Sequence, residues 1–258
     1  MNPALDPLAS FRLDGRVALV TGASSGLGAR FARVLSAAGA RVLVVARRAE
    51  RLEALAAELE DGHAMACDLS VPEQTEDLAA AALAAHGHVD ILVNNAGVSD
   101  GPVRAHEESL EEFRRVVDIN LNAVFHLTRL FAPSMIERGR GAVVNIASVH
   151  GVVGSAPNTQ AAYAASKGAV VNLTRELALQ WARKGVRVNA IAPGYFATEL
   201  NTQMFESERS MSWIERNTPM GRPGDVQELD GALLFLASAA SSYVTGTTLM
   251  VDGGWTAR

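Results

Sequence analysis

Short runs of β-branched and other apolar residues alternate along the chain with longer stretches rich in alanine and leucine. The first four of these segments predict a strand at 16–21, a helix at 26–39, a strand at 41–46 and a helix at 49–60. Further strands are predicted at the nearly continuous apolar runs 64–67, 91–94, 142–147, 187–192 and 248–251. Alternation of strands and helices is typical of a parallel sheet, and continuous apolar runs suit strands that helices cover on both faces.

Two segments, 110–138 and 161–183, show apolar residues at helical spacing over an unusual length. We expect these helices to pack against each other or against a partner subunit, which is most simply a second copy of the chain. The stretch 194–224 is the least regular, and it contains Met204, Phe205, Met211 and Trp213. This stretch is either a substrate lid or a pair of surface helices packed on the core.

Composition agrees with one large globular unit. The chain has 258 residues, of which 48% are hydrophobic, and no linker, repeat or change of composition divides it, so we expect one domain, 1–258. A net charge of -5 argues against a nucleic-acid or anionic-membrane partner. Cys67 is the single cysteine, no apolar run approaches the roughly 20 residues of a membrane helix, and residues 1–14 lack an apolar leader. We therefore expect a cytoplasmic protein.

A glycine-rich turn, G-x-x-x-G-x-G, joins the first predicted strand to the first helix, with its glycines at Gly22, Gly26 and Gly28. Glycines let the backbone approach a pyrophosphate, and the start of a helix offers unpaired N–H groups and a partial positive charge. Glycines are common at any tight turn, so the motif gains its weight from its place in the first strand–turn–helix unit. It predicts a dinucleotide site.

The end of the second strand indicates which dinucleotide binds. Sites that prefer NAD usually place an acid there, whereas this chain has Ala46 followed by Arg47 and Arg48. Two cations at the start of a helix oppose the helix dipole, and a 2′-phosphate would offset that cost. We therefore predict NADP(H). The alternative is that the arginines are solvated and pair with Glu50 or Glu53.

Polar residues also follow the third and fourth strands. Asp68 and Leu69 come after one, and Asn94 to Gly97 come after the other. The carboxyl ends of parallel strands form the ligand crevice of an open sheet, so both segments are expected beside the dinucleotide. An ordinary turn is the alternative for the second segment.

Tyr163 and Lys167 are four residues apart, which places both on one helix face, and Ser148 ends the fifth strand 15 residues earlier. A phenol with a pKa of about 10 is only ~0.1% ionised at pH 7, so it can donate a proton but is a poor base. A lysine cation about 5 Å away would stabilise the phenolate by roughly 3 kcal/mol, or about two pKa units. The Ser148 hydroxyl could hold the substrate oxygen. Without such a site, the pair would be an aromatic residue at the edge of an ordinary helix.

These motifs occur together in one order, and on them the chain resembles the short-chain dehydrogenase/reductase family in its one-domain form. The resemblance runs from Arg16 to Trp255 and rests on Thr21-Gly22-x-x-x-Gly26-x-Gly28, Asn94-Asn95-Ala96-Gly97, Asn120, Ser148, Tyr163-x-x-x-Lys167 and Pro193-Gly194. It implies a doubly wound, Rossmann-like α/β fold with about seven parallel strands and helices on both faces. It also implies a homo-oligomer, a tetramer or a dimer.

The resemblance assigns roles to these residues. Tyr163 would be the general acid/base, Lys167 would lower its pKa and bind the nicotinamide ribose, Ser148 would hold the substrate oxygen, and Asn120 would support a proton relay through water. The implied cofactor site consists of Gly22, Ser24, Ser25, Gly26, Leu27, Gly28, Arg47, Arg48, Asp68, Leu69, Asn95, Ala96, Gly97, Tyr163, Lys167, Pro193, Gly194, Phe196 and Thr198.

The predicted function is therefore an NADP(H)-dependent oxidoreductase that reduces a ketone or 3-oxoacyl group to a secondary alcohol, and the reverse. The alternatives are an NAD-using alcohol, sugar-acid or sterol dehydrogenase, and a non-catalytic NADP(H)-binding regulator. The six histidines lack companions at metal-ligand spacing, so no metal is predicted. His150 either touches substrate or, as we expect, faces solvent. An apolar substrate pocket is indicated by Val149, Val152, Val153, Tyr195, Phe196, Met204 and Trp213.

Overall fold

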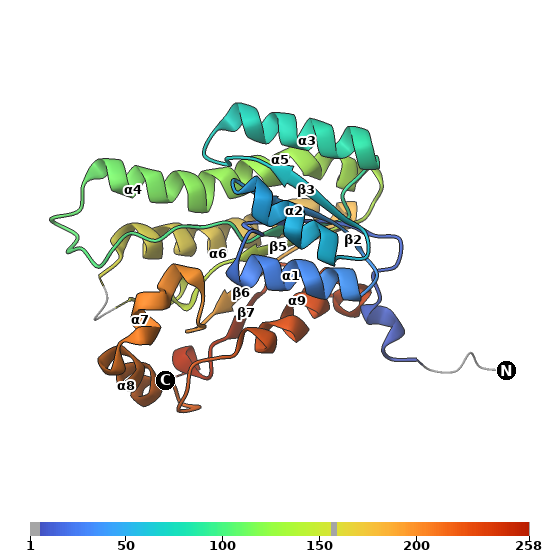
Figure 1. The fold of residues 1–258 in the computed structure, drawn as a ribbon. Helices are drawn as coiled ribbons and strands as arrows, with labels where there is room; N and C mark the ends of the chain where they lie inside the picture. Colours follow the sequence, from blue (N-terminus) through green and yellow to red (C-terminus); the bar gives the residue numbers. More distant parts are fainter. Residues whose placement is uncertain (1–5, 156–158, 258) are drawn as a thin grey trace.

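A computed structural model describes residues 6–155 and 159–257 of the chain. Its centre is a sheet of seven parallel strands in the order β3-β2-β1-β4-β5-β6-β7 (Figure 1). The strands are β1 (Val17–Thr21), β2 (Arg41–Ala46), β3 (Gly62–Ala66), β4 (Ile91–Asn94), β5 (Gly141–Ile146), β6 (Val186–Pro193) and β7 (Thr248–Val251). The predicted doubly wound α/β fold with about seven strands is confirmed, and each predicted strand is present within two residues of its expected bounds.

Helices cover both faces of the sheet. Helices α1 (Gly26–Ala37), α2 (Ala49–Glu58) and α9 (Asp230–Ala237) share a core with one face. Helices α3 (Pro72–His86), α5 (Ala123–Glu137) and α6 (Ala161–Trp181) share a core with the other. Every residue of β1 and β4 is buried, which explains why their sequences are nearly continuous apolar runs, each ending in one polar residue.

The long helical segment predicted at 110–138 is not one regular α-helix. Helix α4 (Leu110–Val117) ends in a π-helical turn, Asp118–Asn122, before α5 begins. The buried Asn120 lies in this turn. Its side-chain amide forms hydrogen bonds with Val98 and Ser166, which lie outside this helical segment. Single π turns inside helices often occur at functional sites. As predicted, this segment packs on the second long helix, since both α4 and α5 contact α6.

The irregular stretch after β6 contains two short helices, α7 (Thr202–Glu206) and α8 (Glu208–Asn217), which contact each other. Ile214 of α8 is fully buried beside Val149 and Trp255, so the pair is anchored to the body of the protein. Figure 1 shows these helices beyond the sheet edge at which β6 ends. Among the helices of residues 6–155 and 159–257, none is long and apolar enough to cross a membrane.

Candidate active site

The turns at the carboxyl ends of six strands line one cleft. Of the sequence-predicted site residues, only Gly28 and Asn120 lie outside its lining. The residues that the structure brings together there are Gly22, Ser24, Ser25, Gly26, Leu27, Arg47, Arg48, Asp68, Leu69, Asn95, Ala96, Gly97, Ser148, Tyr163, Lys167, Pro193, Gly194, Phe196 and Thr198. The sheet topology gathers them because parallel strands all end at the same edge.

The glycine-rich turn is tightly fitted against the turn that follows β4. Gly22 has a φ of 65°, and a Cβ atom there would lie 2.8 Å from the Cα of Ala96. The Asn95 amide donates to the Thr21 carbonyl at 2.9 Å, and the Thr21 hydroxyl accepts the N–H of Asn95 at 3.0 Å. Ser25, the N-cap of α1, makes no side-chain capping bond. This leaves the start of α1 facing the cleft with the donor chemistry that a pyrophosphate requires.

Ser148, Tyr163 and Lys167 meet at the other end of the cleft. The Tyr163 phenol shares a hydrogen bond with the Ser148 hydroxyl. The Lys167 Nζ lies 5.7 Å from the centre of the Tyr163 ring and donates to the carbonyl of Ile146 at 2.7 Å. Ser148 comes from the end of β5, and the other two come from the first two turns of α6, so strand and helix together form the group.

The start of α6 is fixed by a residue that the sequence reasoning missed. Asp100 is buried, and its carboxylate Oδ1 accepts the backbone N–H of Tyr163 at 3.2 Å. A carboxylate at the first turn of a helix stabilises it by satisfying an unpaired donor and by complementing the dipole. Asp100 is 63 residues from Tyr163 in the chain, so only its position just after the Asn-Asn-Ala-Gly segment could have suggested it.

The electrostatics of this group differ from the sequence expectation. Burial raises the pKa of Tyr163, an effect that the hydrogen bond from Ser148 only partly opposes. Burial also lowers the pKa of Lys167 to about 8. The expected lowering of the Tyr163 pKa is therefore wrong for this structure, because the cost of desolvating a phenolate is the largest effect and the nearby Asp100 carboxylate adds to it. At neutral pH the site presents a neutral phenol.

Asn120 lies behind the cleft. Its Oδ1 accepts the N–H of Val98 at 2.8 Å, and its Nδ2 donates to the Val98 carbonyl at 2.8 Å and to the Ser166 hydroxyl at 3.1 Å. A Cβ atom on Gly97 would lie 3.3 Å from the Asn120 Oδ1 and 3.5 Å from the Lys167 Nζ. Asn120 therefore fixes the loop after β4 close to the lysine, and a part in proton relay stays a prediction.

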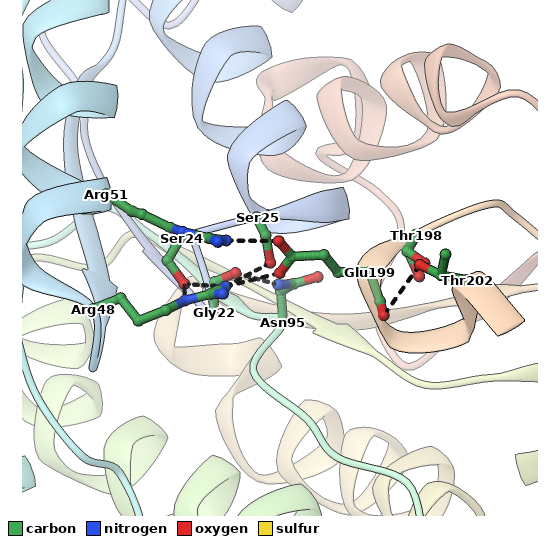
Figure 2. Close-up of polar contacts among 9 residues, drawn as sticks. All are labelled: Gly22, Ser24, Ser25, Arg48, Arg51, Asn95, Thr198, Glu199 and Thr202. Carbon is green, nitrogen blue, oxygen red and sulfur yellow. Dashed lines mark hydrogen bonds and ion pairs between the residues drawn. The ribbon is translucent and has the colours of Figure 1, made fainter.

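Arg48 contacts groups that the sequence did not suggest. Its guanidinium donates to the hydroxyls of Ser24 and Ser25 at 2.9 Å and to the carboxylate of Glu199 at 3.0 Å (Figure 2). Arg51, one helical turn further along α2, donates to the same carboxylate at 2.6 Å. Neither Glu50 nor Glu53 is the partner of Arg48, contrary to the alternative considered above. Glu199 is a site residue that sequence reasoning missed, as was its partner Arg51; the only signal was the spacing of Arg48 and Arg51 on one helix face.

The far end of the site is aromatic. His150 does not face solvent as expected: its Nε2 lies 3.2 Å from the Tyr195 hydroxyl, and burial lowers its pKa. Tyr195 packs on Trp213 and Trp255, with ring centres 5.7 and 4.9 Å away. Of the residues expected to form an apolar pocket, Val149, Tyr195 and Phe196 are buried, and Met204 and Trp213 pack against this cluster. Val152 and Val153 are instead exposed.

The residues present fit a dinucleotide. The cleft offers the uncapped start of α1, glycines that let the protein backbone come close to a ligand, and two arginines at the end of β2. Within the described part of the chain, no group of three or more His, Cys, Asp or Glu side chains could hold a metal ion.

Comparison with known proteins gives consistent matches over almost the whole chain. A family model described as enoyl-(acyl carrier protein) reductase matches residues 22–256. The chain is 46% identical to galactitol 2-dehydrogenase (L-tagatose-forming) of Cereibacter sphaeroides over 255 residues, covering 95% of this chain and 97% of that protein. It is 43% identical to gluconate 5-dehydrogenase of Gluconobacter oxydans, covering 95% and 96% of the two chains.

A solved structure shows the same similarity in three dimensions. The crystal structure of gluconate 5-dehydrogenase from Burkholderia cenocepacia, in complex with NADP and tartrate, matches with a TM-score of 0.93 and 40% sequence identity. The match covers 98% of this chain and 100% of that one.

Proposed function

Because the chain belongs to the short-chain dehydrogenase/reductase family, whose members are oxidoreductases acting on alcohol and ketone groups, we propose that it interconverts a secondary alcohol and a ketone with NADP(H) as cofactor. The observation that carries this proposal is the grouping of Ser148, Tyr163 and Lys167 at one end of the dinucleotide cleft. The proposal treats 1–258 as one dinucleotide-binding catalytic domain, with 194–224 as a substrate lid.

The chemistry follows from the states of these side chains. When bound, the nicotinamide ring supplies or accepts the hydride. In reduction, the neutral Tyr163 phenol donates a proton to the substrate oxygen, and the Ser148 hydroxyl holds that oxygen as charge develops on it. In oxidation, Tyr163 must first lose its proton. Its raised pKa therefore favours reduction near neutral pH and makes oxidation faster in alkaline solution.

The arginine pair at the end of β2 supports NADP(H) as the cofactor. The end of β2 carries Arg47 and Arg48 where an NAD site would carry an acid, and both arginines line the cleft. A 2′-phosphate suits them, since guanidinium groups bind phosphate oxygens with paired, charge-assisted hydrogen bonds. A catalytic efficiency with NADH equal to or above that with NADPH would contradict this part of the proposal.

Polyols and sugar acids are the proposed substrates. The relatives described above are named for galactitol and gluconate, which are hydroxyl-rich molecules. The described structure offers polar groups for such hydroxyls beside Tyr163, since the His150 ring centre lies 6.5 Å from that of Tyr163 and His150 also contacts the Tyr195 hydroxyl. A second candidate is a ketone or 3-oxoacyl substrate, which the apolar side chains Met204, Phe205, Met211 and Trp213 of the lid favour.

The substitution Tyr163→Phe tests the catalytic assignment. Turnover should fall by about 100- to 10,000-fold, because the proton donor is lost, while NADP(H) affinity stays within about twofold of the wild type. Tyr243→Phe is the matched control, since that side chain is fully exposed and should be silent. Activity is measured by NADPH absorbance against a panel of polyols, sugar acids, ketones and 3-oxoacyl thioesters. A Tyr163→Phe variant with unchanged turnover, or a non-catalytic wild type that binds NADP(H), would overturn the assignment.

The proposal includes assembly into a homo-oligomer, a tetramer or a dimer. Phe125 of α5 and Leu179 of α6 are 46% and 80% exposed, which is unusual for large apolar side chains on two long helices. Solution scattering at micromolar concentration tests this, and a monomer would count against it. A cytoplasmic location stays a prediction from the sequence.

A further inference from the structure

Glu199 lies in the dinucleotide cleft, where a carboxylate is not expected. It follows Thr198 in the segment after β6 and lines the same cleft as Arg48 and the glycine-rich turn. Its carboxylate accepts from Arg48 at 3.0 Å and from Arg51 at 2.6 Å, and it also hydrogen bonds with the Ser25 hydroxyl (Figure 2). Glu199 thus joins α2 and α1, on one side of the cleft, to the segment that leads into the lid.

The donors around Glu199 are those that bind a phosphate group. Two guanidinium groups and a serine hydroxyl at the start of a helix would recognise a phosphate as readily as a carboxylate. Together these hydrogen bonds lower the pKa of Glu199 to about 2. The carboxylate is therefore ionised throughout the physiological range and can compete with another anion for these donors.

The ion pairs of Glu199 with Arg48 and Arg51 are weak enough for another anion to replace the carboxylate. The side chains of Arg48, Arg51 and Glu199 are 45%, 51% and 52% exposed, and exposed ion pairs are weak because water and salt screen them. The backbone that carries Glu199 is better fixed. The Asn201 amide oxygen accepts the N–H of Thr198 at 2.8 Å. The Thr202 hydroxyl donates to the Thr198 carbonyl at 3.1 Å (Figure 2). The turn and the start of α7 therefore form one small unit.

We propose that Glu199 is an internal counter-anion, which holds Arg48 and Arg51 in the cofactor-free protein and competes with the 2′-phosphate of NADP(H) for them. The inference rests on the proposed use of NADP(H) and adds a residue that sets the strength of cofactor preference. When the phosphate binds Arg48 and Arg51, the Glu199–Asn201 turn loses the ion pairs that connect it to α2. Since α7 follows directly and its Met204 and Phe205 pack on the aromatic end of the site, cofactor binding would release the substrate side of the cleft.

If Glu199 competes with the 2′-phosphate, removing its charge should change the affinity for NADP+ but not that for NAD+. Glu199→Gln removes the competing charge, so NADP+ should bind about three- to tenfold more tightly, as expected for the loss of two exposed ion pairs. NAD+ lacks the 2′-phosphate and should change by less than about twofold. Glu206→Gln is the matched control, an exposed glutamate at the end of α7, and should change neither affinity. Both affinities are measured by isothermal titration calorimetry.

Two results of that titration would overturn the inference. Equal changes for NADP+ and NAD+ would show that Glu199 does not compete with the 2′-phosphate, and weaker NADP+ binding would show that it assists the cofactor. Hydrogen exchange of the cofactor-free protein gives an independent measurement. Residues 198–206 should exchange faster in Glu199→Gln than in the wild type, and equal rates would refute the tie to α2.

A further variant separates this inference from the proposed function. If the wild type prefers NADP+ and Arg48→Ala removes that preference, while Glu199→Gln changes nothing, the counter-anion is refuted and NADP(H) use stands. If the wild type binds NAD+ as tightly as NADP+ and Arg48→Ala leaves both affinities unchanged, the proposed cofactor is itself wrong.

Discussion

Replacing Gly28 with alanine tests the geometry on which the dinucleotide site depends. Gly28 lies in the first turn of α1, where alanine would ordinarily stabilise a helix by about 1 kcal/mol. Here a Cβ atom would lie 2.7 Å from the Gly22 carbonyl carbon and 2.6 Å from the Asn95 amide nitrogen, whereas ordinary contacts begin at 3.4 Å. The glycine-rich turn would have to retreat by at least about 0.7 Å.

The magnitude of the effect follows from that displacement. Overpacking of this kind costs about 1–3 kcal/mol, which exceeds the gain in helix propensity. The same shift moves the N–H groups that would face the pyrophosphate, so NADP+ affinity should fall by at least about tenfold, a loss of about 1.4 kcal/mol of binding free energy.

Gly231→Ala is the matched control. Gly231 lies in the first turn of α9, has no positive φ, and would have no atom within 4 Å of an added Cβ. Both variants gain the same helix propensity, so the Gly28 variant should be less stable than the Gly231 variant by about 1–3 kcal/mol in urea unfolding. Equal stabilities together with unchanged NADP+ affinity in calorimetry would refute the reasoning.

Two further predictions concern charge. Because the pKa of Lys167 is lowered to about 8, its ammonium loses its proton above that pH, so NADP+ affinity should weaken as pH rises through about 8. Lys184→Gln, at the chain's exposed second lysine, should keep the same profile, and a pH-independent affinity would contradict the role of Lys167. Asp90 is 4% exposed, accepts from Arg138 at 2.8 Å and has a lowered pKa; Asp90→Asn should therefore reduce the free energy of unfolding by about 1–3 kcal/mol at pH 7. Its stabilisation is present above the ordinary aspartate pKa of 3.8 and is lost as pH falls through the lowered value, so the two proteins should converge in acid, and a constant difference would count against it.

The sequence by itself determined the sheet and the position of the cleft. Strands such as β1 and β4 are recognisable because burial on both faces demands continuous apolar runs, and this constraint is local. The glycine-rich turn and the Tyr163–Lys167 pair are likewise read from spacing over a few residues. Once the strands are parallel, their carboxyl ends must share one edge, which is why the predicted cofactor residues line one cleft.

Only the tertiary structure decided which charges meet and how they titrate. Arg48 and Arg51 are 151 and 148 residues from Glu199 in the chain, and no local pattern relates them. The raised pKa of Tyr163 depends on how deeply the phenol is desolvated, which spacing does not reveal. The same holds for His150, whose partner Tyr195 is 45 residues away on the turn after β6. Hydrophobic periodicity depends only on residues close together in the sequence, whereas burial and long-range charge pairing arise only when the chain has folded.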